Sequence, residues 1–255
     1  MPIRSADAER VRNASFFRNA DESTFTCAMS GAFLQRFPAN TTLLLEGDSV
    51  DFLYILLEGA VELGAGWKSR DTTLAILRPV STFILAAVVL DSDALMSAVT
   101  LERSEILMVP GESLRRAMKQ DATFGFAVSE ELAGCYRGLV RSIKNHKLRD
   151  STERLANYLL TQRARQGGKN EITLPHEKRV LAALLGMTPE NLSRAFSKLF
   201  AQGVSVEGAH VKLDKIQALE RLASPNPLID NHYVQEKNTM GKAHTERQQG
   251  VLDKK

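Results

Sequence analysis

The sequence predicts an α+β protein: a β-rich N-terminal half, then a long amphipathic helix, then a helix-turn-helix followed by a β-hairpin. Three observations predict this order. Strand-like runs alternate with Gly or Pro turn signals between Phe37 and Pro110. An apolar stripe with helical spacing follows this region, and further on a glycine separates two short helical segments. The chain has 255 residues, which is enough for two small domains.

The composition excludes several classes of protein. Apolar residues make up 44% and charged residues 25%, an ordinary soluble composition. The longest apolar run, Phe83 to Leu90, is far shorter than the ~18–20 residues that cross a bilayer, and the charged N-terminus lacks the apolar segment of a secretory signal. Two cysteines, Cys27 and Cys135, cannot supply a disulfide framework or four thiolates. We therefore expect a cytoplasmic protein with no membrane partner.

The net charge of +3 hides an uneven distribution. Residues 137–221 hold 16 Lys and Arg against 8 Asp and Glu, whereas the rest of the chain holds 17 basic and 22 acidic residues. A basic C-terminal half suits a polyanionic partner, because neutralising phosphates releases counterions. Charge alone does not decide between nucleic acid and no partner.

Residues 1–20 are polar and Arg-rich and predict an arm or a short helix. Short strand-like runs follow, each ending at a turn signal. The runs are Thr42–Leu45, Phe52–Leu57, Ala60–Leu63 and Leu74–Leu77, and the turn signals are Glu46-Gly47-Asp48, Glu58-Gly59, Gly64-Ala65-Gly66 and Arg78-Pro79. This spacing predicts a β-sandwich or barrel, which either encloses a small ligand or is filled by its own side chains.

A single apolar stripe then recurs every three or four residues along a predicted helix of some 20 residues or more. The stripe consists of Phe124, Val128, Leu132, Cys135, Leu139 and Ile143. It either packs on the chain's own β-roll or pairs with a twin helix in a homodimer. We favour dimerisation, because the segment is longer than a small domain needs. Ser151 to Arg165 predicts a second amphipathic helix.

The stretch from Leu174 to Leu219 predicts a helix-turn-helix with a wing. An apolar helix face ends at Gly186, a residue that accepts the positive φ of a tight turn. Thr188 offers an N-cap hydroxyl, and Pro189 takes the first helical position. The buried stripe of this second helix is Leu192, Ala195, Phe196, Leu199 and Phe200. Two short strands, Val204–Glu207 and His210–Leu213, form a hairpin around Gly208.

The other face of this helix carries hydrogen-bonding groups that suit base edges and phosphates of double-stranded DNA. The predicted DNA-binding residues are Thr188, Glu190, Asn191, Ser193, Arg194, Ser197 and Lys198. The alternative is a helix pair that merely packs, with a solvated polar face. The ordered series of glycine turn, capped helix and hairpin makes us prefer DNA binding.

Several motifs resemble the CRP/FNR family of transcription regulators over about Phe33 to Leu222. Leu184 to Arg194 is similar to the family's helix-turn-helix, and Asn145, Asp150, Thr152 and Arg154 match its hinge. The segments Phe37 to Thr41, Glu46-Gly47-Asp48 and Tyr54 to Val61 match its β-roll strands. Each motif is moderately specific, and their shared order and spacing are highly specific.

The resemblance implies a jelly roll of the cyclic-nucleotide-binding type, a dimerisation helix and a winged helix-turn-helix. It implies a homodimer on a palindromic site with TTG-type half-sites, with RNA polymerase as a further partner. Glu190, Ser193 and Arg194 match the family's base-reading pattern. We predict an arm at 1–20, a β-roll sensor at 21–118, a dimerisation helix and hinge at 119–149, a DNA-binding domain at 150–224 and a flexible tail at 225–255.

The sensor departs from the family's cyclic AMP pattern. A phosphate needs a charge partner or a nest of N–H groups, but residues 81–98 hold no Arg or Lys and two Asp. The family's adenine-contacting pair aligns with Leu139 and Val140. We therefore expect a signal other than cyclic AMP, with a cyclic-nucleotide-type ligand as an alternative.

The effector and any cofactor remain open. Haem would need His146, a cysteine, a methionine or the Pro2 amine, because none of the five histidines lies in the β-roll. The Phe83–Leu90 run resembles the nitrogen-oxide-responsive (NnrR-like) branch, which implies a response to nitric oxide, although core packing explains that run equally well. Without a histidine cluster or a nucleophile–base pair, we expect no enzyme and no metal site.

Overall fold

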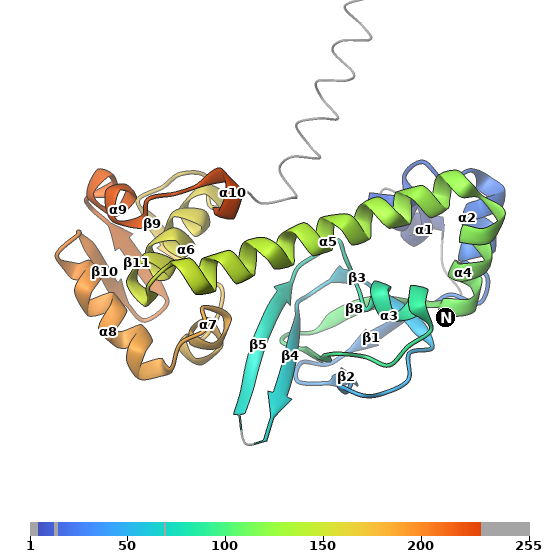
Figure 1. Ribbon diagram of the computed structural model, residues 1–255, viewed down its shortest axis with the longest axis horizontal. Coiled ribbons are helices and arrows are strands. Elements are labelled where there is room, and N and C mark those ends of the chain that lie inside the picture. The colour runs from blue at the N-terminus through green and yellow to red at the C-terminus, as the bar shows by residue number, and fades with distance from the viewer. Residues whose placement is uncertain (1–4, 13–14, 69, 231–255) are drawn as a thin grey trace, which may run out of the picture. The chain divides into compact units, whose positions relative to one another are not determined.

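The computed structural model describes residues 5–12, 15–68 and 70–230. The chain divides into two compact units, Met1–Ala133 and Gly134–Lys255 (Figure 1). Each unit has its own hydrophobic core. The division falls inside the long helix α5 (Ala122–Leu148). In the described ranges no helix is both long and apolar enough to cross a membrane.

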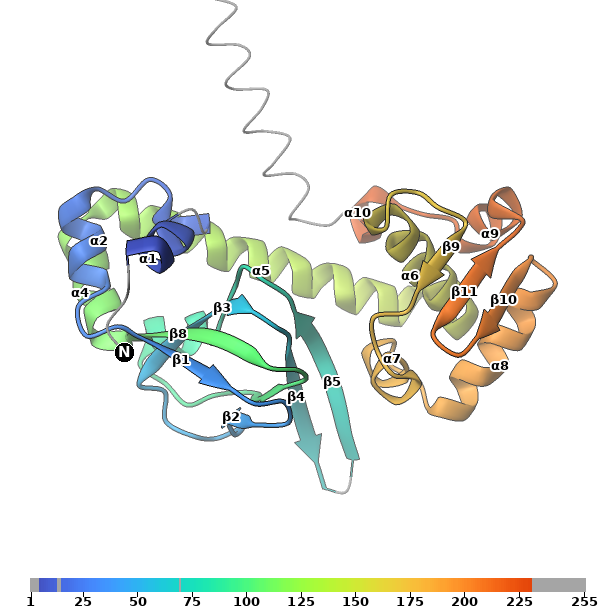
Figure 2. The same ribbon diagram turned by 180° about the vertical axis from the view of Figure 1, so that it is seen from behind.

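The first unit is a β-roll of two antiparallel four-stranded sheets, as predicted (Figure 2). One sheet has the order β1 (Phe33–Phe37), β8 (Ser104–Pro110), β3 (Phe52–Glu58), β6 (Ser81–Phe83). The other has the order β2 (Thr42–Leu44), β7 (Ser97–Thr100), β4 (Val61–Trp67), β5 (Arg70–Leu77). The accompanying helices are α1 (Ser5–Arg12), a 3₁₀ turn (Ser15–Phe17), α2 (Glu22–Ala28), α3 (Leu85–Leu90) and α4 (Gly111–Gln120).

Strand β3 forms the middle of the first core. It is buried over five consecutive residues, Leu53 to Leu57, instead of at alternate positions. Alternation is lost when both faces of a strand are covered, and here helices α1 and α3 also contact β3. Aromatic rings close the same core, because Phe16 and Phe17 lie 6.0 and 5.6 Å from Phe124, centroid to centroid. Part of the predicted N-terminal arm therefore belongs to the folded unit.

One predicted turn is wrong. Gly64, Ala65 and Gly66 lie inside β4 and pair with Thr73, Thr72 and Asp71 of β5. A Cβ on Gly66 would lie 2.9 Å from the Asp71 carboxylate, and one on Gly64 would lie 3.3 Å from the Thr72 carbonyl oxygen. Glycine serves here for close approach within a bulged strand, not for a turn.

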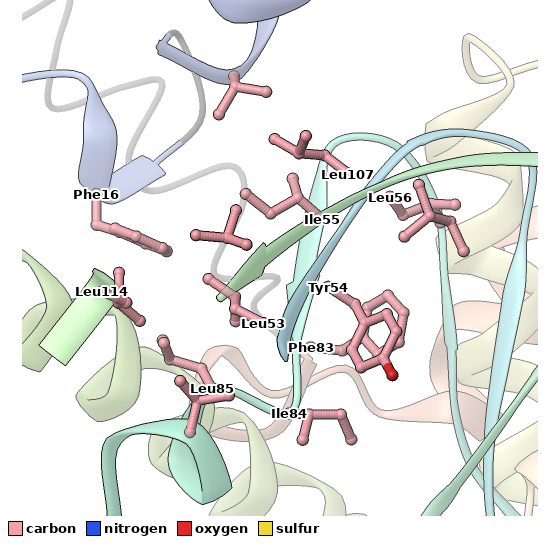
Figure 3. Close-up of a cluster of buried hydrophobic side chains, with 14 of the residues drawn as sticks. Phe16, Leu53, Tyr54, Ile55, Leu56, Phe83, Ile84, Leu85, Leu107 and Leu114 are labelled. Atoms are coloured by element: carbon pink, nitrogen blue, oxygen red, sulfur yellow. The ribbon is translucent and has the colours of Figure 1, made fainter. Parts of the chain in front are cut away.

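The Phe83–Leu90 run divides between two elements. Phe83 ends β6, and the run continues through Ile84 into helix α3. Figure 3 shows Phe83, Ile84 and Leu85 in the cluster of buried side chains, where the Phe83 ring stacks on Tyr54 at 5.1 Å. Core packing therefore accounts for most of this run.

The second unit surrounds helix α6 (Ser151–Arg165), whose bounds match the prediction. Asp150 caps α6, and Glu153 completes a reciprocal capping box. The other elements are β9 (Glu171–Thr173), α7 (Lys178–Leu184), α8 (Pro189–Phe200), β10 (Val204–Glu207), β11 (His210–Leu213), α9 (Ile216–Ala223) and α10 (Pro227–Asp230). The strands form one antiparallel sheet in the order β10-β11-β9, and the hairpin has the predicted bounds.

The apolar stripe of α5 is not a single dimer face. Phe124 is 1% exposed and Val128 is fully buried, both inside the first core, and Leu132 packs against that core. The prediction that Phe124 and Val128 contact a partner helix is therefore wrong, because side chains already buried in their own unit have no surface to offer a partner. Cys135, Leu139 and Ile143 are exposed.

The predicted tail begins with a folded segment. Residues 227–230 form α10, in which Asp230 pairs with Arg149. The rest of the predicted tail, from residue 231, lies outside the described residues.

Candidate DNA-binding interface

The start of α8 has the predicted local chemistry. Gly186 follows α7 with a φ of +62°, a backbone conformation that favours glycine. Thr188 is the N-cap, and its Oγ1 accepts a hydrogen bond of 3.3 Å from the Asn191 amide. Pro189 occupies the first turn, where a missing N–H costs nothing. Turn and cap together determine where the helix begins.

Helix α8 has one buried and one exposed side. Leu192, Ala195 and Leu199 lie in the core of the second unit, and Phe196 packs against it. Phe200 was expected in this stripe, but it is 73% exposed. It lies one residue past Leu199, about 100° further around the helix, which carries it off the buried face.

All seven predicted DNA-binding side chains are exposed. They are Thr188, Glu190, Asn191, Ser193, Arg194, Ser197 and Lys198. The hydroxyls of Ser193 and Ser197 donate to the carbonyl oxygens of Pro189 and Ser193, each at 3.0 Å. Their oxygen lone pairs remain available as acceptors.

Glu190 is held in its charged form at the N-terminus of α8. Its own backbone N–H, the Thr188 hydroxyl and, to a smaller extent, the Arg194 charge lower the pKa of the Glu190 carboxyl, which is fully exposed. At neutral pH this side chain is therefore an acceptor only, next to a guanidinium that only donates.

Two side chains outside α8 support the turn before it. The Arg154 Nε donates to the Leu185 carbonyl oxygen at 2.9 Å, and another of its nitrogens donates to the Gly186 carbonyl oxygen at 3.4 Å. The His146 ring lies against Gly186, where a Cβ would be 2.5 Å from the ring's Cδ2. The sequence showed Arg154 only as a motif match. The spacing of Asp150 and Glu153 was the local signal for the capping box at the start of α6.

Residues 81–98, the β-roll segment without Arg or Lys, carry apolar side chains into the core. Phe83, Ile84, Leu85 and Val88 are buried there. Arg115 of α4 reaches this segment, but its guanidinium donates to the Val88 carbonyl oxygen at 2.7 Å and pairs with Asp91 at 2.9 Å. These residues do not fit a cyclic nucleotide phosphate, because the cation already has a carboxylate partner.

The histidine named for haem already has a backbone partner. His146 lies in the second unit, where its Nδ1 hydrogen-bonds the Ser142 carbonyl oxygen at 2.8 Å. Pro2 lies outside the described residues. Among the described residues, no three His, Cys, Asp or Glu side chains are placed to hold a metal ion.

Known proteins resemble both units. A family model described as a cyclic nucleotide-binding domain matches residues 34–121, and one described as a Crp-like helix-turn-helix domain matches residues 153–222. The global nitrogen regulator of Nostoc sp. is 28% identical over 144 residues, which is 54% of this chain and 65% of that protein. The CRP-like cAMP-activated global transcriptional regulator of Mycobacterium tuberculosis is 23% identical over 84% of this chain and 99% of that protein.

A solved structure shares the fold. FixK2 of Bradyrhizobium japonicum superposes with a TM-score of 0.66 at 23% identity, covering 76% of this chain and 98% of that one. The β-roll, the long helix and the C-terminal helix-turn-helix thus occur together in a known protein. The chain therefore carries two matched domains in a fixed order, a cyclic nucleotide-binding domain followed by a Crp-like helix-turn-helix domain.

Proposed function

We propose that this protein is a homodimeric transcription regulator that reads a palindromic DNA site with α8 and responds through its β-roll to a signal other than cyclic AMP. The observation that carries the proposal is the single exposed face of α8, with the Glu190 carboxylate one turn from the Arg194 guanidinium. An arginine donates two bonds to a guanine, and a carboxylate accepts from a cytosine amino group.

The expected site consists of two TTG-type half-sites about one helical turn apart, as the family resemblance implies. Dimerisation would use the exposed part of α5, where Cys135, Leu139 and Ile143 lie beside Tyr136 and Val140. Leu139 is 59% exposed, and covering such a stripe with a second copy of the helix would bury it. RNA polymerase is the further partner that the resemblance implies.

Nitric oxide is the proposed signal, on the resemblance of the Phe83–Leu90 run to the nitrogen-oxide-responsive branch. A cyclic nucleotide is the second candidate, because the mycobacterial relative is cAMP-activated. The Arg115–Asp91 pair weighs against the second candidate, because the cation nearest this segment already has a carboxylate partner.

The DNA proposal is tested by fluorescence anisotropy with a palindromic duplex and a shuffled duplex of equal length. We expect tight binding of the palindrome by a dimer and a steep loss of affinity with added salt, because phosphate contacts release counterions. Equal affinity for both duplexes at every salt concentration, or a monomer in sedimentation at binding concentrations, would overturn it.

The signal proposal is tested in the same assay without oxygen. A nitric oxide donor should change the affinity for the palindrome, whereas cyclic AMP should not. A response to cyclic AMP alone would reverse the choice between the two candidates. An absorption spectrum of the purified protein, with and without added haem, shows whether a Soret band accompanies the response.

A further inference from the structure

Arg149 lies at the junction of α5 and α6 and is paired to the C-terminal end of the described chain. Its guanidinium forms two hydrogen bonds with the Asp230 carboxylate, of 2.5 and 2.7 Å. The Arg149 side chain is only 7% exposed and that of Asp230 is 22% exposed. A two-pronged arginine–carboxylate pair that is largely shielded from water is both stronger and more directional than a surface ion pair.

Helix α10 is shaped to present this carboxylate. The Asn226 amide donates to Asp230 at 2.6 Å, and the Asn226 side chain accepts from the Leu228 amide at 2.8 Å. A second contact runs from Lys144 on α5, whose Nζ donates to the Leu228 carbonyl oxygen at 3.3 Å. The segment 226–230 lies beyond the matched helix-turn-helix domain, and Arg149 lies before it.

Arg149 is in turn linked to the turn that precedes α8. Its backbone carbonyl accepts a 2.7 Å hydrogen bond from Arg154, the residue whose guanidinium also holds the carbonyl oxygens of Leu185 and Gly186. Arg149 therefore links Asp230, bonded to its guanidinium, with Arg154, bonded to its backbone carbonyl, and Arg154 in turn reaches the backbone two residues before Thr188.

We propose that residues 226–230 form a C-terminal clamp that fixes the α5–α6 junction and, through Arg149 and Arg154, positions the recognition helix α8. Asp230 and Arg149 are positioning residues in this device, because neither belongs to the exposed face of α8. The inference rests on the proposed DNA-binding function and adds a segment outside the matched domain to it.

The first test compares full-length Asp230→Asn with wild type on the palindromic and the shuffled duplex. A loosened recognition helix loses base contacts but keeps the general attraction of its charges for phosphates. We therefore expect affinity for the palindrome to fall about tenfold with little change on the shuffled duplex. A merely unfolded fraction would lower binding of both duplexes equally. Asp93→Asn, an exposed site in the first unit, makes the same change in net charge and should leave both affinities unchanged.

Neutralising the other member of the ion pair separates the clamp from a simple effect of net charge. Arg149→Gln changes net charge in the opposite direction from Asp230→Asn, yet the clamp predicts the same loss of palindrome affinity. The double variant should lose less than the two single losses combined, because it leaves no unpaired charge behind. Additive losses in the double variant would contradict the clamp. So would a gain of palindrome affinity in one single variant and a loss in the other.

Hydrogen–deuterium exchange followed by mass spectrometry tests the connection without DNA. Asp230→Asn should speed exchange in peptides that cover residues 145–150 and 183–188 as well as in α10, and Asp230→Glu should restore part of the protection. Faster exchange confined to α10 would overturn the inference. If wild type itself does not prefer the palindrome, the proposed function fails, but the exchange result still decides the clamp.

Discussion

The two units differ in where they place the residues that the sequence singles out for function. In the second unit, all seven side chains predicted to contact DNA stand on the exposed side of α8. In the first unit, the run that most suggested an effector site supplies Phe83, Ile84, Leu85 and Val88 to the core. Polar residues at helical spacing therefore indicated an exposed surface, whereas an apolar run without polar partners indicated a part of the core.

A pair of phenylalanine substitutions gives the largest expected contrast between the units. Phe83→Ala should cost about 3–5 kcal/mol of unfolding free energy, because it removes a buried ring stacked on Tyr54. Phe200→Ala should change it by less than about 0.5 kcal/mol, since that ring is exposed. Chemical denaturation of both variants measures the difference. A small loss for Phe83→Ala together with a lost response to nitric oxide would point to an effector pocket instead of core packing.

The turn before α8 gives the next largest effect. Gly186→Ala should cost about 2–3 kcal/mol of stability, because the new methyl group would meet the His146 ring in a backbone conformation that already disfavours alanine. Gly208→Ala in the hairpin is the matched control: its φ of +61° is almost the same, but a Cβ there meets nothing within 4 Å. It should cost only about 1 kcal/mol. Equal losses of stability in the two variants, measured by denaturation, would show that His146 does not support the turn.

These two glycines show what sequence can predict. The turn at Gly186, the cap at Thr188 and the hairpin at Gly208 depend on residues only a few positions apart, and the structure confirms all three. The His146 contact could not be predicted, because it joins residues 40 positions apart through packing. The long stripe of α5 failed for the same reason: its period identifies a helix, but not which core covers each part.

The glycines of β4 mark another limit of sequence reasoning. Gly64 and Gly66 predicted a turn, yet they lie in a strand where a side chain would meet the neighbouring strand. Glycine is used at both kinds of position, so its presence alone does not separate them. The C-terminal clamp was likewise invisible, because Pro225 and a polar sequence after it predicted only a tail.

Arg194→Ala should weaken binding of the palindrome by about 1–3 kcal/mol and relax the preference for guanine at its contact. Arg221→Ala, an exposed arginine of α9 in the same unit, removes the same charge and serves as the control. Anisotropy titrations with duplexes that differ at single base pairs measure both. Equal weakening by the two variants on every duplex would reduce the role of Arg194 to general charge.

The smallest expected effect concerns the ionisation of Glu190. An ordinary glutamate is already charged between pH 8 and pH 6, so base reading by Glu190 should not change over that range. Its lowered pKa extends the charged form to a pH below the one at which an ordinary glutamate protonates. Thr188→Val removes a hydroxyl that favours the charged form and should raise the pKa of Glu190 toward its ordinary value. NMR titration of the side-chain carboxyl measures the shift. An unchanged or lower pKa in Thr188→Val would contradict this account of the helix start.

The central claim is that the Arg194 guanidinium on α8 reads a guanine in the major groove. The most direct test replaces that guanine by 7-deazaguanine, which lacks the N7 acceptor, and measures binding by wild type and by Arg194→Ala. We predict that wild type loses about 1–3 kcal/mol on the modified duplex, whereas Arg194→Ala binds both duplexes equally. The same loss for both proteins would contradict the claim.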